Sequence, residues 1–301
     1  MVIFYRRMPR FDYARARSIE EALALIADEV PAKHQVFAGG SDLLPKLKSR
    51  AIKAPRRVID LKGIAELDYL DWDPGQGLRI GALATSRTVG SSPLVVDRFT
   101  ALAQGAQQMG SNQLQNRGTI AGNICNAVPS ADSAPPLLAH GAKVICVGAG
   151  GERTVELDDF FRGAGETALQ QGELVKEIRV PPPERGERSV YLRLAQRGRL
   201  DLAIVGVAVS AVIEGGVVRK ARIGLGSAAP VPVRAREAES ALVGRRLDAE
   251  AIGNAARIAS EKSRTRSSHR ASADYRRMMI EVLTRRALAG LAEAATRSKH
   301  A

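Results

Sequence analysis

Residues 118–132 have the sequence Gly-Thr-Ile-Ala-Gly-Asn-Ile-Cys-Asn-Ala-Val-Pro-Ser-Ala-Asp, which combines small residues with short polar side chains. Gly118 and Gly122 leave room for a ligand near the backbone, and successive N–H groups in a glycine turn suit phosphate oxygens. Thr119 and Asn123 add side-chain donors, while Asp132 supplies an acceptor for a hydroxyl group. The stretch therefore predicts a site for a long, anionic ligand. The alternative is a tight turn between two core segments, because short glycine motifs also arise by chance.

A second glycine-containing stretch lies upstream. The apolar, strand-like run Val36-Phe-Ala38 breaks into Gly39-Gly-Ser-Asp42 and resumes at Leu43 as an amphipathic segment. We refer to residues 36–43 as the first glycine segment and to residues 118–132 as the second. Two such turns on separate parts of a chain can hold a diphosphate from both sides, so we expect them to share one cavity.

Two further motifs follow in the C-terminal third, Arg-Ile-Gly-Leu-Gly-Ser-Ala-Ala-Pro-Val-Pro-Val-Arg-Ala at 222–235 and Arg-Ala-Ser-Ala-Asp-Tyr-Arg-Arg at 270–277. Together with the glycine segments, they resemble the FAD-binding medium subunit of molybdenum-containing hydroxylases. That family includes xanthine dehydrogenases, carbon monoxide dehydrogenases and 4-hydroxybenzoyl-CoA reductases. The resemblance keeps the same order from Phe11 to Leu288 and so covers nearly the whole chain.

The resemblance implies an α+β fold. It predicts a two-part FAD-binding region of the PCMH (vanillyl-alcohol oxidase) type, followed by a C-terminal antiparallel sheet with helices. The expected domains are an N-terminal FAD-binding subdomain at 1–61, a second at 62–183, and a C-terminal flavoprotein domain with a three-stranded sheet and helices at 184–301. The triple proline 181–183 cannot join a helix or a central ladder, which independently favours a boundary there.

The resemblance also implies an oxidoreductase subunit. It would bind FAD, receive electrons from a 2Fe-2S small subunit fed by a large molybdopterin-binding subunit, and pass them to an external acceptor. The expected assembly is a dimer of heterotrimers, with substrate chemistry on a partner. No histidine lies in either glycine segment, so FAD is expected to bind non-covalently. No Cys-rich insertion lies between Asn126 and Asp132, so this chain should lack the 4Fe-4S cluster of 4-hydroxybenzoyl-CoA reductases.

Carried over position by position, the resemblance assigns cofactor contacts to both glycine segments, a helix end, the strand before the triple proline and the segment after it. These candidates are Val36, Phe37, Ala38, Gly39, Gly40, Ser41, Asp42, Leu43, Met109, Gly118, Thr119, Gly122, Asn123, Asn126, Asp132, Val175, Arg193 and Leu202. Arg193 stands where relatives often place a lysine near the flavin, and Ala121 stands where they usually have glycine. No residue is assigned a catalytic acid–base role or a metal, because the cofactor carries the redox chemistry.

Composition excludes several other classes of protein. No apolar run approaches the roughly 20 residues of a membrane span, so we expect a cytoplasmic protein. Cys125 and Cys146 form no CxxC, which argues against a disulfide framework or a metal site on this chain. The net charge of +13 raises nucleic acid as an alternative partner, but aromatic residues make up only 4% of the chain and no nucleic-acid-binding signature occurs. A stand-alone flavin oxidoreductase of the same fold is the other alternative.

Local patterns predict the order of elements. A capping box at Ser18-Ile-Glu-Glu21 starts a helix to Glu29, and another helix restarts at Leu43 with Lys46, Lys48 and Arg50 facing outward. Helices are also predicted near 85–93 and at 101–109. Strands are expected at 35–37, 57–61, 78–83, 142–147, 173–180, 190–194, 203–213 and 217–225, with a hairpin turn at 73–77.

Two weaker patterns complete the prediction. Tyr275, Met278, Met279, Val282 and Leu283 have helical spacing, which indicates a stripe that packs into a core. The four histidines are scattered and form no catalytic set, so each is expected on the surface or in a loop.

Overall fold

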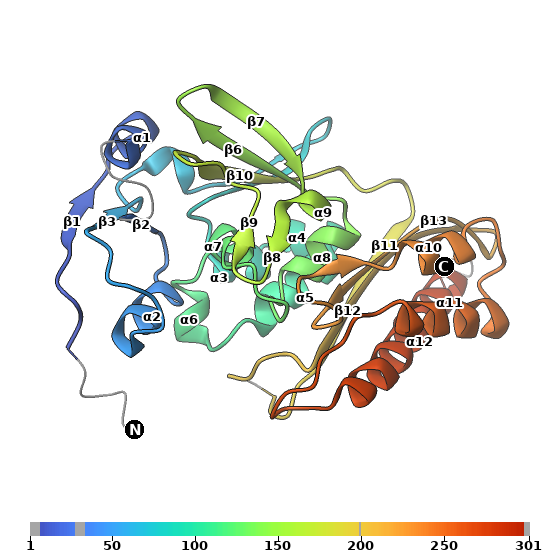
Figure 1. Cartoon of the computed structure of the whole chain (residues 1–301). Helices are drawn as coiled ribbons and strands as arrows, with labels where there is room; N and C mark the ends of the chain where they lie inside the picture. Colours follow the sequence, from blue (N-terminus) through green and yellow to red (C-terminus); the bar gives the residue numbers. More distant parts are fainter. Residues whose placement is uncertain (1–6, 28–33, 199, 298–301) are drawn as a thin grey trace.

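The computed structural model describes residues 7–27, 34–198 and 200–297. Its elements form three successive regions, each built on one main sheet (Figure 1). Within these described ranges, no helix is both long enough and apolar enough to cross a membrane.

The N-terminal region is a parallel sheet with strand order β1 (Asp12–Arg15), β3 (Arg57–Asp60), β2 (His34–Phe37). Helices α1 (Ile19–Ala27) and α2 (Leu43–Ser49) connect these strands in the order β-α-β-α-β, and both helices were predicted together with β2 and β3. The predicted capping box forms, since Ser18 Oγ accepts from the Glu21 N–H and Glu21 Oε2 accepts from the Arg17 N–H. The predicted helix end at Glu29 lies outside the described residues.

The middle region contains a five-stranded antiparallel sheet with strand order β4, β5, β10, β6, β7. Its strands are β4 (Leu70–Asp73), β5 (Gly77–Gly81), β6 (Lys143–Gly148), β7 (Gly151–Glu156) and β10 (Leu174–Val180). The predicted turn at 73–77 joins β4 to β5. Strand β7 was not predicted.

The other middle elements are η2 (Ala65–Leu67), α3 (Ser86–Ser91), α4 (Pro93–Arg98), α5 (Thr100–Gln108), α6 (Asn112–Gln115), α7 (Ile120–Cys125), α8 (Ala134–Ala139), α9 (Leu157–Phe160), β8 (Phe161–Gly163) and β9 (Glu166–Thr167). One hydrophobic core joins this region to the N-terminal sheet, because Ile59 and Leu61 are buried together with Leu78, Phe99 and Ile178.

The C-terminal sheet has strand order β11 (Glu187–Leu194), β12 (Val205–Glu214), β13 (Val217–Gly226), β14 (Val233–Arg234), and is antiparallel. Helices α10 (Arg236–Leu242), α11 (Ala249–Glu261) and α12 (Ala273–Arg297) pack beside it, and α5 and α8 of the middle region also contact it (Figure 1). Strand β12 lies inside the sheet, in keeping with its apolar sequence. The sequence predicted three strands here, but the sheet has four, because β14 was not predicted.

The predicted packing stripe of α12 is only partly confirmed: Leu283 lies in the core and Met279 packs against it. Tyr275 is 40% exposed and Met278 is 52% exposed, whereas Arg276, Ile280 and Thr284 are buried. Arg276 is tolerated there because its guanidinium donates to the Ile204 carbonyl and to Ser268 Oγ. The buried face of α12 therefore includes Leu283 of the predicted stripe and excludes Tyr275 and Met278.

The expectation for the histidines fails at His140. It is buried at the end of α8, where its ring meets Phe99 edge-on and Nδ1 lies 3.8 Å from Glu187 Oε1. Burial lowers the pKa of His140 to about 4. His140 is therefore a neutral core residue in the contact between α8 and β11.

Candidate functional site

The two glycine segments meet backbone to backbone. A Cβ atom on Gly39 would lie 2.0 Å from the Arg117 carbonyl oxygen and 2.9 Å from Gly118 Cα. No side chain fits into that space, so glycine at position 39 is required for the contact between the segments. The predicted shared cavity depends on this close approach.

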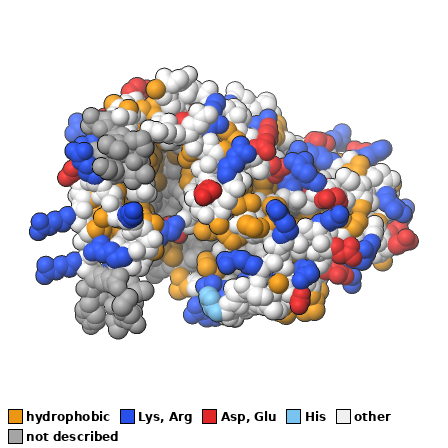
Figure 2. All heavy atoms as spheres, in the orientation of Figure 1, with side chains coloured by type: hydrophobic (Ala, Val, Ile, Leu, Met, Phe, Trp, Pro, Cys, Tyr) orange, Lys and Arg blue, Asp and Glu red, His pale blue; other side chains and the backbone are white. Residues whose placement is uncertain are grey.

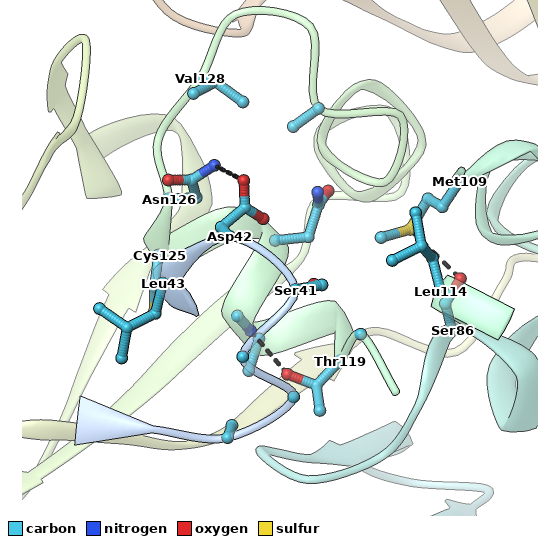
Figure 3. A pocket seen from close by; sticks show the side chains of 18 of the residues that line it. Ser41, Asp42, Leu43, Ser86, Met109, Leu114, Thr119, Cys125, Asn126 and Val128 are labelled. Atoms are coloured by element: carbon cyan, nitrogen blue, oxygen red, sulfur yellow. Dashed lines mark hydrogen bonds between the residues drawn. The ribbon is translucent and has the colours of Figure 1, made fainter. Parts of the chain in front are cut away.

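A cavity of about 770 Å³ opens where the segments meet, within the range of about 300 to 1,000 Å³ that is usual for ligand pockets. All the candidate residues line it except Arg193. The close-up in Figure 3 shows Ser41 and Asp42 of the first segment opposite Thr119 and Asn126 of the second. In Figure 2 the molecular surface is hollowed between the N-terminal region and the rest of the molecule.

The first glycine segment links β2 to α2 and presents backbone donors. Gly40 has φ +73°, a left-handed conformation that favours glycine. Within the described part of the chain, the N–H groups of Gly39, Gly40 and Ser41 form no hydrogen bond. Three successive unpaired donors at a cavity wall are suited to an anionic group.

The second glycine segment differs from the open turn that the sequence suggested. Thr119 caps the short helix α7, and its Oγ1 accepts from the Gly122 N–H at 2.9 Å. The Gly122 N–H is therefore used inside the chain. Asn123 Oδ1 likewise accepts from Ser133 Oγ at 2.7 Å, which leaves the amide nitrogen of Asn123 as a donor.

A polar bridge connects the two segments at one end of the cavity. Asn126 Nδ2 donates to Asp42 Oδ1 at 2.9 Å (Figure 3). Lys46 Nζ in turn donates to Asn126 Oδ1. Lys46 lines the cavity, so the prediction that it faces outward is wrong. Its position only a few residues after the glycine turn was the signal available in the sequence.

Asp132 is a buried carboxylate at the cavity wall, only 7% exposed. Its Oδ1 accepts from the Tyr191 hydroxyl at 2.7 Å and lies 3.1 Å from Arg193 Nε. Burial raises the pKa of Asp132 to about 6, although Arg193 and the Tyr191 hydrogen bond act in the opposite direction. Arg193 thus lies behind the cavity wall, and the sequence did not indicate that it pairs with Asp132.

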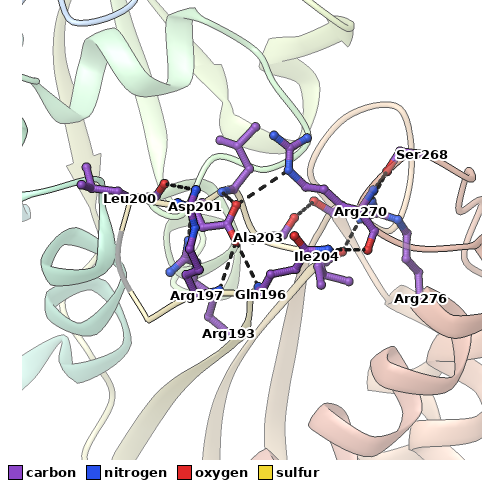
Figure 4. A network of polar contacts seen from close by, with 12 residues as sticks. Arg193, Gln196, Arg197, Leu200, Asp201, Ala203, Ile204, Ser268, Arg270 and Arg276 are labelled. Atoms are coloured by element: carbon purple, nitrogen blue, oxygen red, sulfur yellow. Dashed lines mark hydrogen bonds and ion pairs between the residues drawn. The ribbon is translucent and has the colours of Figure 1, made fainter.

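The loop between β11 and β12 closes another side of the cavity. Leu202 lines the cavity as predicted, and Arg197, Asp201 and Arg270 line it as well. Asp201 Oδ2 accepts from the Arg197 N–H at 3.2 Å, and its Oδ1 lies 3.8 Å from Arg270 Nε (Figure 4). The C-terminal region therefore contributes charged residues that the sequence analysis missed.

Cys125 also lines the cavity. Burial raises the pKa of its thiol to about 12, so the thiol stays protonated and unreactive at neutral pH. Cys125 therefore serves as a small apolar side chain in the cavity wall. In the parts of the chain that the structure describes, no group of three His, Cys, Asp or Glu residues is placed to hold a metal ion.

These features fit a flavin dinucleotide. Unpaired backbone donors and Lys46 suit a diphosphate, and Asp132 suits a hydroxyl group. Apolar side chains from both segments and from Met109, Val175 and Leu202 provide a slot for a flat ring.

Comparison with known proteins supports this assignment. Residues 9–183 match the family described as the FAD binding domain in molybdopterin dehydrogenase, and residues 190–291 match the CO dehydrogenase flavoprotein C-terminal domain. The glyceraldehyde dehydrogenase medium chain of Sulfolobus acidocaldarius is 33% identical, over 93% of this chain and 97% of the relative. The carbon monoxide dehydrogenase medium chain of Hydrogenophaga pseudoflava is 35% identical, over 93% of this chain and 96% of the relative.

Solved structures give the same result. The carbon monoxide dehydrogenase of Hydrogenophaga pseudoflava superimposes with a TM-score of 0.91 at 35% identity, covering 96% of this chain and 99% of that one. Quinoline 2-oxidoreductase from Pseudomonas putida 86 superimposes with a TM-score of 0.89 at 28% identity, with the same coverage. The predicted resemblance and fold class are confirmed, and the chain belongs to the family of FAD-binding medium subunits of molybdenum-containing oxidoreductases.

Proposed function

We propose that this chain binds FAD non-covalently in the cavity between the two glycine segments and transfers electrons to an external acceptor. The observation that carries the proposal is the backbone contact between Gly39 and Arg117-Gly118, which brings both segments to one cavity. The bound flavin would supply the redox chemistry. The protein binds, orients and shields it.

The diphosphate would lie against the N–H groups of Gly39, Gly40 and Ser41, with the ammonium of Lys46 as the nearby positive charge. Asp132 would accept a hydrogen bond from a hydroxyl of the cofactor. Met109, Val175 and Leu202 would contact the ring, and the Gly122 N–H would support α7 rather than the ligand.

We further propose that the electrons come from a 2Fe-2S small subunit, which receives them from a large molybdopterin-binding subunit where the substrate reacts. A dimer of heterotrimers is the proposed assembly. The relatives are named as medium chains of dehydrogenases, which supports the proposal that this chain assembles with partner subunits.

The test is titration of flavin-free protein with FAD, followed by flavin absorbance and fluorescence. We expect saturable binding, with FAD released intact on denaturation. A protein that stays colourless after titration would contradict the assignment.

Replacement of Lys46 by methionine examines the diphosphate site. The change removes the ammonium and keeps most of the side-chain volume, so we expect FAD affinity to fall about tenfold, which is about 1.4 kcal/mol. Lys48→Met on the same helix is the matched control, because Lys48 does not line the cavity. Equal affinities for the two variants would exclude Lys46 from the site.

A further inference from the structure

Strand β11 belongs to the C-terminal sheet, yet two of its side chains meet the cavity wall. Tyr191 and Arg193 are two residues apart and so lie on the same face of the strand. Both contact the same oxygen, Oδ1 of Asp132. The other oxygen, Oδ2, forms no bond to any part of the chain that the structure describes.

We propose that Tyr191 and Arg193 are positioning residues for the cofactor that act through Asp132. By binding Oδ1 from behind the wall, they fix the carboxylate so that Oδ2 is left to accept a hydroxyl group of the cofactor. This proposal rests on FAD binding in the cavity. It assigns part of the cofactor site to the C-terminal sheet.

Tyr191 is held rigidly enough for this role. Its N–H donates to Gln104 Oε1 at 2.7 Å, and its side chain is 3% exposed. The ring lies over Gly206 of the neighbouring strand, where a Cβ atom would be 2.5 Å from the Tyr191 hydroxyl oxygen. Glycine at 206 thus leaves space for the hydroxyl to reach Asp132.

Arg193 is held at two points. Its Nε lies 3.1 Å from Asp132 Oδ1, and its Nη2 donates to the backbone carbonyl of Asp201 in the β11–β12 loop. Its side chain is 3% exposed, so this ion pair is not weakened by water. Arg193 therefore connects Asp132 with the loop that carries Leu202.

The charge of Asp132 depends on these two partners. Arg193 and Tyr191 are the groups that face it directly, and both favour the ionised form against the effect of burial. The other charged residues of the cavity are Asp42, Lys46, Glu173, Arg197, Asp201 and Arg270. An ionised Asp132 can accept hydrogen bonds at both oxygens, whereas a protonated Asp132 carries an O–H group that itself needs an acceptor.

The experiment measures the dissociation constant of FAD between about pH 5 and about pH 8. The diphosphate stays fully ionised across this range, so a change in affinity reports on the protein. For the wild type, we expect affinity to rise with pH through about 6, the pKa of Asp132. Asp132→Asn should bind more weakly and lose this pH dependence.

Tyr191→Phe removes only the hydroxyl group. In the wild type, the hydrogen bond from Tyr191 lowers the pKa of Asp132. Its loss should therefore raise this pKa and move the midpoint of the affinity curve to higher pH. At neutral pH we expect a three- to tenfold loss of affinity, as for a hydrogen bond of about 1 kcal/mol. Arg193→Met should move the midpoint in the same direction, and Arg193→Lys should restore part of the change.

Tyr69→Phe is the matched control. The Tyr69 hydroxyl donates to the buried Glu177 carboxylate, and neither residue lines the cavity. The control should lose stability as Tyr191→Phe does, with the dissociation constant of FAD and its midpoint unchanged. If Tyr191→Phe does not fold, Arg193→Met and Arg193→Lys provide the comparison.

This proposal alone would be overturned if the wild type binds FAD and the pH midpoint of FAD affinity is the same in Tyr191→Phe, Arg193→Met and Tyr69→Phe as in the wild type. A wild type that binds no FAD would overturn the proposed function as well.

Discussion

Glu177 and Asp132 are both buried carboxylates that accept a hydrogen bond from a tyrosine, yet their pKa values are shifted in opposite directions. Glu177 in the five-stranded sheet is bonded to Tyr69, Arg79 and Arg179. Burial acts to raise the pKa of Glu177, but these partners more than offset it and the pKa is lowered. Asp132 at the cavity has a single guanidinium partner, and burial raises its pKa to about 6.

The difference separates a structural carboxylate from one kept for a ligand. Glu177 is bonded through both oxygens, so its charge is neutralised inside the sheet. Asp132 is bonded at one oxygen and remains short of partners until something occupies the cavity. A site that is incomplete without its ligand costs stability, and the ligand recovers that cost on binding.

The largest effect is expected from neutralising Glu177. Glu177→Gln leaves Arg79 and Arg179 without their counter-charge and should lower the free energy of unfolding by about 3 kcal/mol, the lower end for a buried pair because both arginines are partly exposed. Urea unfolding at neutral pH measures this. A variant as stable as the wild type would mean that Glu177 is not a structural charge.

Asp132→Asn should instead raise the free energy of unfolding of the flavin-free protein. The pKa of Asp132 is higher in the folded state than in the unfolded state, so the folded state holds the proton longer and this group lowers stability as pH rises from about 4 to about 6. The shift in the pKa of Asp132 corresponds to about 3 kcal/mol. Because Asp132→Asn also weakens the contact with Arg193, we expect its free energy of unfolding to rise by only about 2 kcal/mol at neutral pH.

Urea unfolding of wild type and variant at about pH 4.5 and about pH 7.5 checks this sign. The variant should be favoured more at the higher pH. A difference that is the same at both values would show that Asp132 is already ionised in the folded protein at the lower pH.

The smallest effect is spectroscopic. At about pH 5, flavin-free wild type should show the infrared carbonyl band of a buried protonated carboxyl group, because the pKa of Asp132 is about 6. The band should disappear in Asp132→Asn and persist in Glu177→Gln. Loss of the band in Glu177→Gln instead would reverse the assignment of the two carboxylates.

Much of the fold follows from local sequence signals, such as the capping box at Ser18 and Glu21 and the apolar run of β12. The failures have physical causes. Arg276 is buried in α12 because the Ile204 carbonyl and Ser268 satisfy it, while Met278 remains exposed, so hydrophobicity alone identified only part of the buried face. Strand β14 is two residues long and follows Pro232, which hides it from any periodicity.

The site was predictable where it is built from consecutive residues. Both glycine segments line the cavity, but the reason for Gly39 is contact with Arg117, which is distant in sequence. The inward direction of Lys46 and the pairing of Arg193 with Asp132 likewise depend on which segments pack together. Contacts of this kind leave no periodic signal in a single sequence.

The position of β11 limits how relatives could exchange parts. The family matches divide the chain between residues 183 and 190, so a chimera joined at the triple proline would combine a foreign strand with this Asp132. Such a hybrid could complete every sheet and still bind its nucleotide poorly. Recombination should succeed better with a junction after residue 194, which transfers Tyr191 and Arg193 together with the carboxylate they hold.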